Sequence, residues 1–395
     1  MKKLLSIVVM LIIMSCGLHA QTYKTMTFGG IERQYIEYIP SSYDASTPAP
    51  IMFFLHGLGD NITSAFNNCD FTAIAEEHGW ILVYPQATDF SVELPGVGTY
   101  QFNSIWNAGI SVTLTFMIYG FPVSFDITLN GEVDDEGFLM SILSNMKDEY
   151  AIDESQIYFT GFSLGACMCH RMGINYGDMI NGVASISGIV GNDMIEMPPY
   201  GNVNMLVAFG TEDQVIEYGT ATYNAGEYGS FNIGLDAEAT VKFWYEHNQC
   251  ETTPVVEQYP DLVNDGLTFT MSQYLNGVND SRVGFLKIEG GEHSWYQGPN
   301  YDIDYPTEIY RFFTNTLDVT STEEYQDNLL NVYPNPAKDI VYLDLNGSAI
   351  VTVYDLTGSK VLETRTQGTL DVSTLSNGIY FMQVGTKMNK IIINK

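Results

Sequence analysis

The stretch Gln156-Ile157-Tyr158-Phe159-Thr160-Gly161-Phe162-Ser163-Leu164-Gly165 joins a short apolar run to a serine that stands between two glycines. The run predicts a buried strand, and the residues up to about Tyr176 predict a helix that starts at once. Gly161 and Gly165 suit this junction because a Cβ would clash where strand and helix pack closely. The turn would lift the Ser163 hydroxyl out of a sheet and set the Leu164 N–H beside a reacting carbonyl. We therefore predict Ser163 as a nucleophile and Leu164 as an oxyanion donor.

Apolar runs and helical patterns alternate on both sides of this stretch. Strands are expected at 51–55, 80–84, 156–160, 183–186, 205–209 and 285–288, and helices at 71–77, 134–150, 164–176, 237–247 and 305–316. This alternation predicts an α/β fold with a mostly parallel sheet and helices on both faces. Residues 22–40 are expected to form a hairpin. Residues 88–132 look like an insertion with a hairpin around 111–129.

A serine nucleophile needs a base, which in this fold class follows it in the chain. Of five histidines beyond residue 20, only His247 and His293 follow Ser163 outside its own helix. His247 falls within a predicted helix, where it is expected to be a surface residue. His293 lies in a glycine-rich loop directly after a strand, from which an imidazole can reach the nucleophile. We predict His293 as the general base.

The acid and a second oxyanion donor are expected in loops that follow strands. The run 205–209 leads into Gly210-Thr211-Glu212-Asp213, and we predict that Asp213 orients the base. Glu212 is its competitor, and the alternative role is a turn carboxylate that caps backbone amides. The loop 55–59 offers the Leu58 N–H as the second oxyanion donor. His56 is expected to shape this loop rather than to act as a base.

The N-terminal residues have the pattern of a secretory signal peptide. Lys2 and Lys3 precede an apolar run from Leu4 to Met14, and Ala20 marks the expected cleavage position. The run is shorter than a membrane span needs, and no other stretch is long and apolar enough. We therefore predict a signal peptide at 1–20 and no stable membrane span.

The chain has 16 Lys and Arg against 47 Asp and Glu, a net charge of −31, or −33 without Lys2 and Lys3. This balance argues against a nucleic-acid partner, because phosphate binding needs clustered cations. Four cysteines remain after residue 20, and export makes one or two disulfides expected. Their pairing stays open, although Cys167 and Cys169 point to different helix faces. No paired CxxC motif suggests a metal site, and no cofactor is expected.

Several ordered motifs in residues 22–317 resemble one known family. They are LHGLGDN at 55–61, VDDEGF at 133–138, YFTGFSLGACM at 158–168, FGTEDQVIEY at 209–218 and GGEHSW at 290–295. Together they resemble the polyhydroxybutyrate depolymerase and feruloyl esterase group, close to the first family of carbohydrate esterases. The resemblance implies a Ser163–His293–Asp213 triad and a structural role for Asp134 and Asp135. It also implies an ester substrate, either linked to plant polysaccharide or part of a polyester.

The sequence departs from this family where substrate would bind. Phe209 stands where the family usually has histidine, the segment 103–107 matches only in part, and 108–132 is longer than expected. Trp106 and Trp295 are predicted to bind substrate. Further candidate pocket walls are Phe102, Phe116, Tyr119 and Phe121. Ordinary core packing is the alternative for all six aromatic residues.

The C-terminal part is expected to be separate. Residues 318–327 are polar and predict a linker, and 328–395 show short alternating runs with turn signals between them, which predicts a small all-β sandwich. The segments Val332–Asp339, Val353–Gly358 and Leu375–Tyr380 resemble a type IX secretion sorting domain. This resemblance implies export through the periplasm and outer membrane by that machinery. A carbohydrate-binding or adhesive module is the alternative.

Together these patterns predict a secreted or cell-surface serine carboxylic ester hydrolase, with its esterase domain at 21–317. Two alternatives stay open: a serine peptidase of the same fold, and a surface binding protein that has lost activity. The sequence leaves the acyl group and the oligomeric state undetermined.

Overall fold

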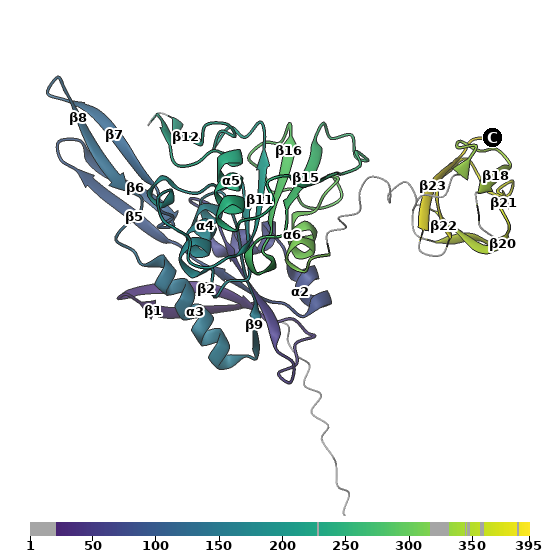
Figure 1. The fold of residues 1–395 in the computed structure, drawn as a ribbon, viewed down its shortest axis with the longest axis horizontal. Helices are drawn as coiled ribbons and strands as arrows, with labels where there is room; N and C mark the ends of the chain where they lie inside the picture. The colour runs from purple at the N-terminus through teal and green to yellow at the C-terminus, as the bar shows by residue number, and fades with distance from the viewer. Residues whose placement is uncertain are drawn as a thin grey trace, which may run out of the picture. The chain divides into compact units, whose positions relative to one another are not determined.

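The computed structural model describes residues 21–316 except 227–228, and residues 332–395 except 344, 346–347, 356–358 and 385–386. The chain divides into two compact units, residues 1–317 and 318–395 (Figure 1). The predicted signal peptide at 1–20 and linker at 318–327 lie outside the described residues. Each unit is described by itself below.

A large mixed sheet forms the first unit. Its described strands run in the order β1 (Thr22–Phe28), β2 (Ile31–Tyr38), β4 (Ile81–Pro85), β3 (Ala49–Leu55), β9 (Ile152–Phe162), β10 (Gly182–Ile186), β11 (Asn204–Gly210), β16 (Val283–Glu289), β15 (Thr268–Tyr274) and β14 (Val255–Gln258). From β4 to β16 neighbouring strands are parallel, whereas both edges are antiparallel. The predicted α/β fold is confirmed.

Two hydrophobic clusters cover the two faces of this sheet. Phe53 and Phe54 are consecutive in β3, yet each is buried in a different cluster. Because successive strand residues point to opposite faces, β3 must be covered on both sides. The helices divide accordingly. One face carries α3 (Asp135–Glu149), α4 (Leu164–Tyr176) and α5 (Ala237–His247), and the other carries α1 (Ile62–Asn68), α2 (Thr72–His78) and α6 (Tyr305–Phe313).

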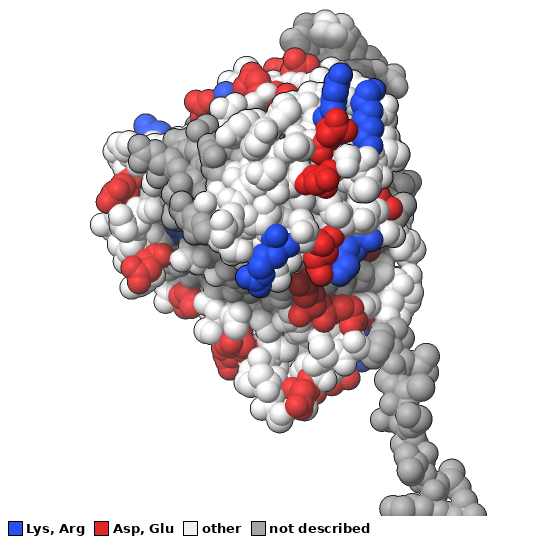
Figure 2. Space-filling model, turned by 90° about the vertical axis from the view of Figure 1, so that its right-hand side faces the viewer, with Lys and Arg blue, Asp and Glu red and all other residues white. Residues whose placement is uncertain are grey.

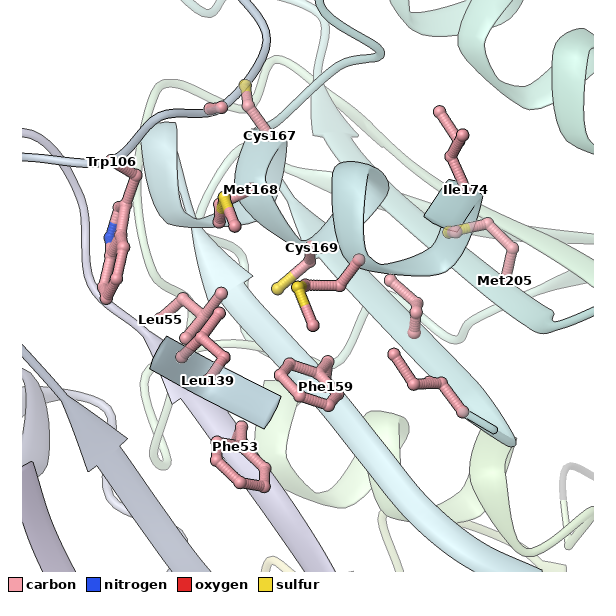
Figure 3. Close-up of a cluster of buried hydrophobic side chains, with 14 of the residues drawn as sticks. Phe53, Leu55, Trp106, Leu139, Phe159, Cys167, Met168, Cys169, Ile174 and Met205 are labelled. Atoms are coloured by element: carbon pink, nitrogen blue, oxygen red, sulfur yellow. The ribbon is translucent and has the colours of Figure 1, made fainter. Parts of the chain in front are cut away.

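The core beneath α4 holds the turn that contains Ser163 in place. Figure 3 shows Cys169 and Met168 of α4 above Phe53 and Phe159 of the central strands. The two phenylalanine rings stack with their centroids 4.6 Å apart. Such close-packed side chains fix the height of the helix above the sheet, and therefore the position of its first residue.

The four described cysteines are all free and buried, so the prediction of disulfides is wrong. Cys69 belongs to the cluster on one face of the sheet, whereas Cys167, Cys169 and Cys250 belong to the other. Within α4, Cys167 and Cys169 point in different directions, as expected. Burial raises the pKa of Cys167 to about 11. These thiols therefore remain neutral and act as small hydrophobic side chains.

Two antiparallel hairpins leave the sheet between β4 and α3. They are β5 (Thr88–Leu94) with β6 (Gly98–Ile105), and β7 (Ser111–Ile118) with β8 (Phe121–Thr128). Only the second was predicted. A further small hairpin joins β12 (Thr222–Asn224) to β13 (Ser230–Asn232). Figure 1 shows the first two hairpins extending beyond the sheet, side by side.

The second unit is a small all-β domain, as predicted. Its described strands form a three-stranded sheet of β17 (Val332–Tyr333), β18 (Ile340–Leu343) and β21 (Thr369–Asp371), and a four-stranded sheet of β20 (Lys360–Thr366), β19 (Ala349–Tyr354), β22 (Gly378–Val384) and β23 (Lys387–Ile393). Its own hydrophobic cluster includes Val341, Val353 and Met382. Sequence patterning therefore predicted the all-β character of this unit.

Charged side chains are scattered over the surface. On the face drawn in Figure 2, Lys and Arg stand beside Asp and Glu without forming an extended basic patch among the coloured residues. Within the part of the chain that the structure describes, no helix has the length and apolar character needed to cross a membrane.

We predict that buried His170 makes the fold sensitive to acid. Its Nδ1 accepts a 2.9 Å hydrogen bond from the Trp244 indole, which links α4 to α5. Burial lowers the pKa of His170 to about 3. The unfolded chain, with an ordinary histidine pKa, then takes up the proton first as pH falls. Stability should therefore drop by about 2 kcal/mol per such histidine between pH 7 and 5.

Urea unfolding of His170→Gln at both pH values tests this, with partly exposed His78→Gln as the matched control. His170→Gln should lose less stability on acidification than either the parent or His78→Gln. An unchanged acid loss in His170→Gln would contradict the assignment.

Candidate active site

Ser163 occupies a strained turn between β9 and α4. Its backbone has φ 57° and ψ −123°, a region that residues with side chains rarely adopt. The Ser163 N–H donates to the Ile186 carbonyl at 2.9 Å, which ties the turn to neighbouring β10. Leu164 opens α4, so its N–H has no partner within the helix. The sharp strand–turn–helix geometry expected around Ser163 is therefore present.

Close backbone contact explains both glycines around Ser163. A Cβ on Gly161 would lie 2.7 Å from the Leu55 carbonyl oxygen, and a Cβ on Gly165 would collide with the same carbonyl. These contacts let β9, α4 and the end of β3 approach each other. A Cβ on Gly57 would lie 3.4 Å from the Ser163 Cβ. The loop after β3 thus lies directly beside the serine.

Asp213 and His293 form a hydrogen-bonded pair. The His293 Nδ1 lies 2.7 Å from the Asp213 Oδ2, and Asp213 is almost fully buried. Its other oxygen accepts the N–H groups of Val215 and Ile216, both at 2.9 Å. These bonds hold the carboxylate in one orientation. It can then hold the imidazole with a proton on Nδ1, which leaves Nε2 free to accept one.

The loops that carry this pair are fastened together. The Glu212 N–H donates to the Gly291 carbonyl at 2.8 Å, and the Gly290 N–H donates to the Thr211 hydroxyl at 2.9 Å. Because β11 and β16 are neighbouring parallel strands, their carboxyl ends bring these loops side by side. The Glu212 side chain is exposed. Asp213 is therefore the carboxylate in contact with His293.

The imidazole lies next to the serine turn. The ring of His293 packs against Phe162, the residue before Ser163, with centroids 4.8 Å apart. Within the described residues the Ser163 hydroxyl makes no hydrogen bond, including to His293. In unliganded serine hydrolases this bond is often long and tightens only with substrate. The three predicted side chains therefore come from distant parts of the chain to one region.

Hydrogen bonds of buried side chains hold the loop 56–59 in place. The His56 Nε2 accepts N–H groups from Ala87 and Gln86, both at 3.1 Å, so its Nδ1 carries the proton and donates to the Gly57 carbonyl at 2.8 Å. Burial lowers the pKa of His56 and favours this neutral form. The Trp106 indole donates to the His56 carbonyl at 2.9 Å. Buried His56 therefore shapes the loop, and Leu58 lies beside Ser163.

An apolar cavity of about 290 Å³ opens beside the serine. Ser163, Leu164 and Leu58 line it together with side chains from the hairpins and from the segment 216–233. Its described lining includes no Asp, Glu, Lys, Arg or His. The aliphatic part of the lining comprises Ile105, Ile110, Val112, Leu114, Ile127, Leu129, Ile216 and Ile233. Such a cavity favours a neutral, apolar group next to the hydroxyl.

The aromatic residues predicted to line the pocket lie in different parts of the structure. Phe102 lines the cavity, but fully buried Trp106 does not. Trp295 does not line the cavity either; it packs edge-on against Phe54 and Phe162, and its indole donates to the Gln297 side chain. Tyr119 and Phe121 are 96% and 72% exposed at a hairpin tip, and neither they nor Phe116 line the cavity. The sequence signal missed the aliphatic wall. Its two β7 residues, Val112 and Leu114, alternate along the strand and could have been found by that period.

The acidic residues before α3 are structural, as the resemblance implied. Asp134 caps the helix by accepting the Gly137 N–H at 2.8 Å. Buried Asp135 pairs with Arg33 at 2.7 Å and accepts the Asn107 N–H at 2.8 Å. This network anchors the segment after Trp106. Within the described residues no group of three or more His, Cys, Asp or Glu could hold a metal ion.

Comparison with known proteins agrees with both resemblances. Residues 331–394 match the family described as the secretion system C-terminal sorting domain. The chain is similar to feruloyl esterase B of Thermothelomyces thermophilus, with 24% identity over 38% of this chain and 43% of that protein. It is also similar to the putative esterase NocK of Nocardia uniformis subsp. tsuyamanensis, with 22% identity over 63% of this chain and 66% of that protein.

A third relative widens the range of substrates among similar proteins. Poly(3-hydroxyalkanoate) depolymerase C of Paucimonas lemoignei is 28% identical over 39% of this chain and 31% of its own length. This chain thus spans one third to two thirds of the length of these relatives. Among solved structures, the acetyl xylan esterase from Aspergillus awamori aligns at a TM-score of 0.47, with 14% identity over 74% of this chain and 98% of that one. The predicted resemblance to the feruloyl esterase and depolymerase group is confirmed.

Replacing Asp213 by asparagine should leave the fold intact but lower kcat for 4-nitrophenyl butyrate by about 10⁴-fold. Asparagine favours the wrong imidazole tautomer, because it can donate to Nδ1 where the carboxylate only accepts. Glu212→Gln, one residue away and exposed, is the matched control and should stay within about twofold of the parent. Steady-state kinetics check both. Asp213→Asn with more than a tenth of the parental kcat would rule out this carboxylate.

Proposed function

We propose that this chain is an exported carboxylic ester hydrolase that works through an acyl-enzyme on Ser163. The carrying observation is the 2.7 Å Asp213–His293 hydrogen bond beside the Ser163 turn, at the edge of an apolar cavity. Similarity to feruloyl esterases and a depolymerase supports the same reaction class. An orienting acid, a base and a nucleophile on a strained turn are the parts that acyl transfer requires.

The proposed reaction has two halves. The Ser163 Oγ attacks the ester carbonyl carbon while the His293 Nε2 takes the hydroxyl proton. Asp213 holds the Nδ1–H and stabilises the imidazolium. The tetrahedral intermediate collapses, the C–O bond to the alcohol breaks, and His293 returns its proton to the leaving alkoxide. His293 then takes a proton from water, whose oxygen attacks the acyl carbonyl carbon. The bond from this carbon to the Ser163 Oγ breaks, His293 returns the proton to Oγ, and the acid leaves.

Backbone amides would stabilise the oxyanion. The Leu164 N–H stands at the first position of α4, where the helix dipole also favours negative charge. The Leu58 N–H belongs to the loop whose Gly57 abuts Ser163. Loss of one such donor typically raises the barrier by about 2.7–4 kcal/mol. The reaction requires neither metal nor organic cofactor.

The cavity chemistry selects the substrate class. An uncharged, largely aliphatic lining suits a neutral acyl group longer than acetyl. Feruloyl esters, acetylated xylan and polyhydroxyalkanoates are the substrates named for similar proteins, and we propose a neutral ester of this broad kind. The sorting domain at 331–394 supports export, which we assign to type IX machinery across the periplasm and outer membrane, to the cell surface or beyond.

Acyl chain length should control activity. We expect kcat/KM to rise at least about tenfold from 4-nitrophenyl acetate to the hexanoate, because each buried methylene contributes about 0.8 kcal/mol. Leu114→Asp, which places a charge in the cavity lining, should abolish the rise. Thr115→Asp, one residue along on the exposed face of β7, is the control and should preserve it. A flat chain-length profile in the parent would contradict a buried acyl group.

Comparison of an ester with its matched amide separates the rival functions. The parent should hydrolyse 4-nitrophenyl butyrate and cleave the butyryl 4-nitroanilide at least about a thousandfold more slowly, a difference of about 4 kcal/mol in barrier. Ser163→Ala should lose the esterase activity. Comparable anilide cleavage would favour a peptidase, and an inert parent would favour a binding protein.

A further inference from the structure

The two hairpins form an arm that carries little charge on an acidic protein: its charged residues are Asp89 and Glu93 of β5 and Asp126 of β8. Residues 94–125 contain no Asp, Glu, Lys, Arg or His, although residues 21–317 carry 38 Asp and Glu against 8 Lys and Arg. This uncharged run spans nearly all of β6, β7 and β8 and the turns between them. A projecting surface element normally carries charge for solubility. The absence of charge over residues 94–125 calls for a functional cause.

Packing between the two hairpins explains the apolar residues on only one face of the arm. Along β7 the residues alternate between half-buried and exposed, and the half-buried set faces β5–β6. The Tyr100 and Phe116 rings meet with centroids 6.0 Å apart, and a Cβ on Gly96 would lie 3.3 Å from the Ile118 side chain. The inner faces of the hairpins therefore pack together, which leaves the tip unexplained.

The tip of β7–β8 exposes three large apolar side chains. Met117 is 69% exposed, Tyr119 96% and Phe121 72%. Tyr119 and Gly120 form the two-residue turn with φ 51° and 83°, values that fit a type I′ turn. Such turns prefer Asn-Gly, because asparagine tolerates positive φ better than tyrosine. Neither turn geometry nor packing favours tyrosine here, so folding does not explain this residue.

The arm is continuous with the candidate active site. Tyr100 and Phe102 of β6, with Val112 and Leu114 of β7, line the cavity that reaches Ser163. A surface held at the tip would therefore lie next to the strands that wall the acyl cavity. A surface bound at the tip would therefore be close enough to supply the acyl group that enters the cavity.

We propose that the β7–β8 tip docks the enzyme on a fluid, electrically neutral lipid surface, such as an acylglycerol emulsion, from which acyl chains enter the cavity. Met117 and Phe121 would insert, and Tyr119 would sit at the boundary, where an aromatic ring with a polar end is favoured. Insertion requires a fluid phase rather than a solid polymer. The strong negative charge of residues 21–317 opposes anionic lipid surfaces, which makes a neutral surface the complementary one. The substrate part of this inference rests on the proposed esterase function.

Partitioning of full-length Ser163→Ala protein onto trioctanoin emulsion tests docking without turnover. Simultaneous Met117→Ser, Tyr119→Ser and Phe121→Ser changes should weaken partitioning at least tenfold. In the active enzyme they should lower emulsion hydrolysis similarly and leave kcat/KM for dissolved 4-nitrophenyl butyrate unchanged. Leu262→Ser, which removes an 83% exposed side chain elsewhere, is the control and should change neither.

Tyr119→Asn gives a second test that a damaged fold cannot imitate. Asparagine fits the turn better, so the variant should unfold at equal or higher urea concentration while partitioning more weakly.

Unchanged partitioning of the triple variant overturns the proposal. Stronger binding to phosphatidylglycerol vesicles or polyester film than to trioctanoin also overturns it, as does a tip-dependent dimer in sedimentation velocity. If the parent hydrolyses no ester yet partitions through the tip, the esterase proposal fails and docking stands; if it hydrolyses dissolved esters without partitioning, only docking fails.

Discussion

The contact between the Leu55 carbonyl and the two glycines around Ser163 governs the rest of the structure. A Cβ on Gly161 would lie 2.7 Å from that oxygen, so only glycine lets β9, α4 and the end of β3 meet. Their approach forces Ser163 into a backbone region that side chains rarely adopt. It also places the loop 56–59 beside the serine, where His56 and Trp106 hold it from below. One steric constraint thus accounts for both the strained serine turn and the position of the loop in which we propose the second oxyanion donor.

The parallel sheet supplies the remaining side chains. Because β11 and β16 are adjacent and parallel, the loops after them end at the same edge of the sheet and exchange backbone hydrogen bonds. Asp213 and His293, 80 residues apart, therefore meet at 2.7 Å. This geometry explains why a serine, an acid and a base can be scattered along the sequence. It also explains why each of them directly follows a buried strand.

Much of this arrangement was predictable from the sequence because it is local or tied to strand ends. The buried central strands, the glycine-flanked turn and the loops of Asp213 and His293 all leave short-range signals. Other features depend on tertiary contacts. The sequence does not reveal that the sheet separates Cys69 from the other three cysteines or that all four thiols are free, and disulfides were wrongly expected. Trp106 was expected in the pocket but is buried, and its indole donates a hydrogen bond to the His56 carbonyl in the loop 56–59. Much of the cavity wall comes from the two hairpins. The mixed polar and aromatic residues of β5 and β6 hid their strand periodicity, so the first hairpin was not predicted.

These hairpins supply an uncharged wall next to the serine. In the proposed function this wall favours a neutral acyl group. The central claim is that Ser163, His293 and the amides of Leu58 and Leu164 act on one carbonyl carbon. A crystal structure of the enzyme treated with a butyl fluorophosphonate tests it most directly. The account predicts phosphorus bonded to the Ser163 Oγ, its oxygen within hydrogen-bond distance of both amides, the His293 Nε2 beside the Oγ and the butyl chain in the cavity. An unmodified Ser163, or an adduct whose oxygen points away from both amides, would contradict it.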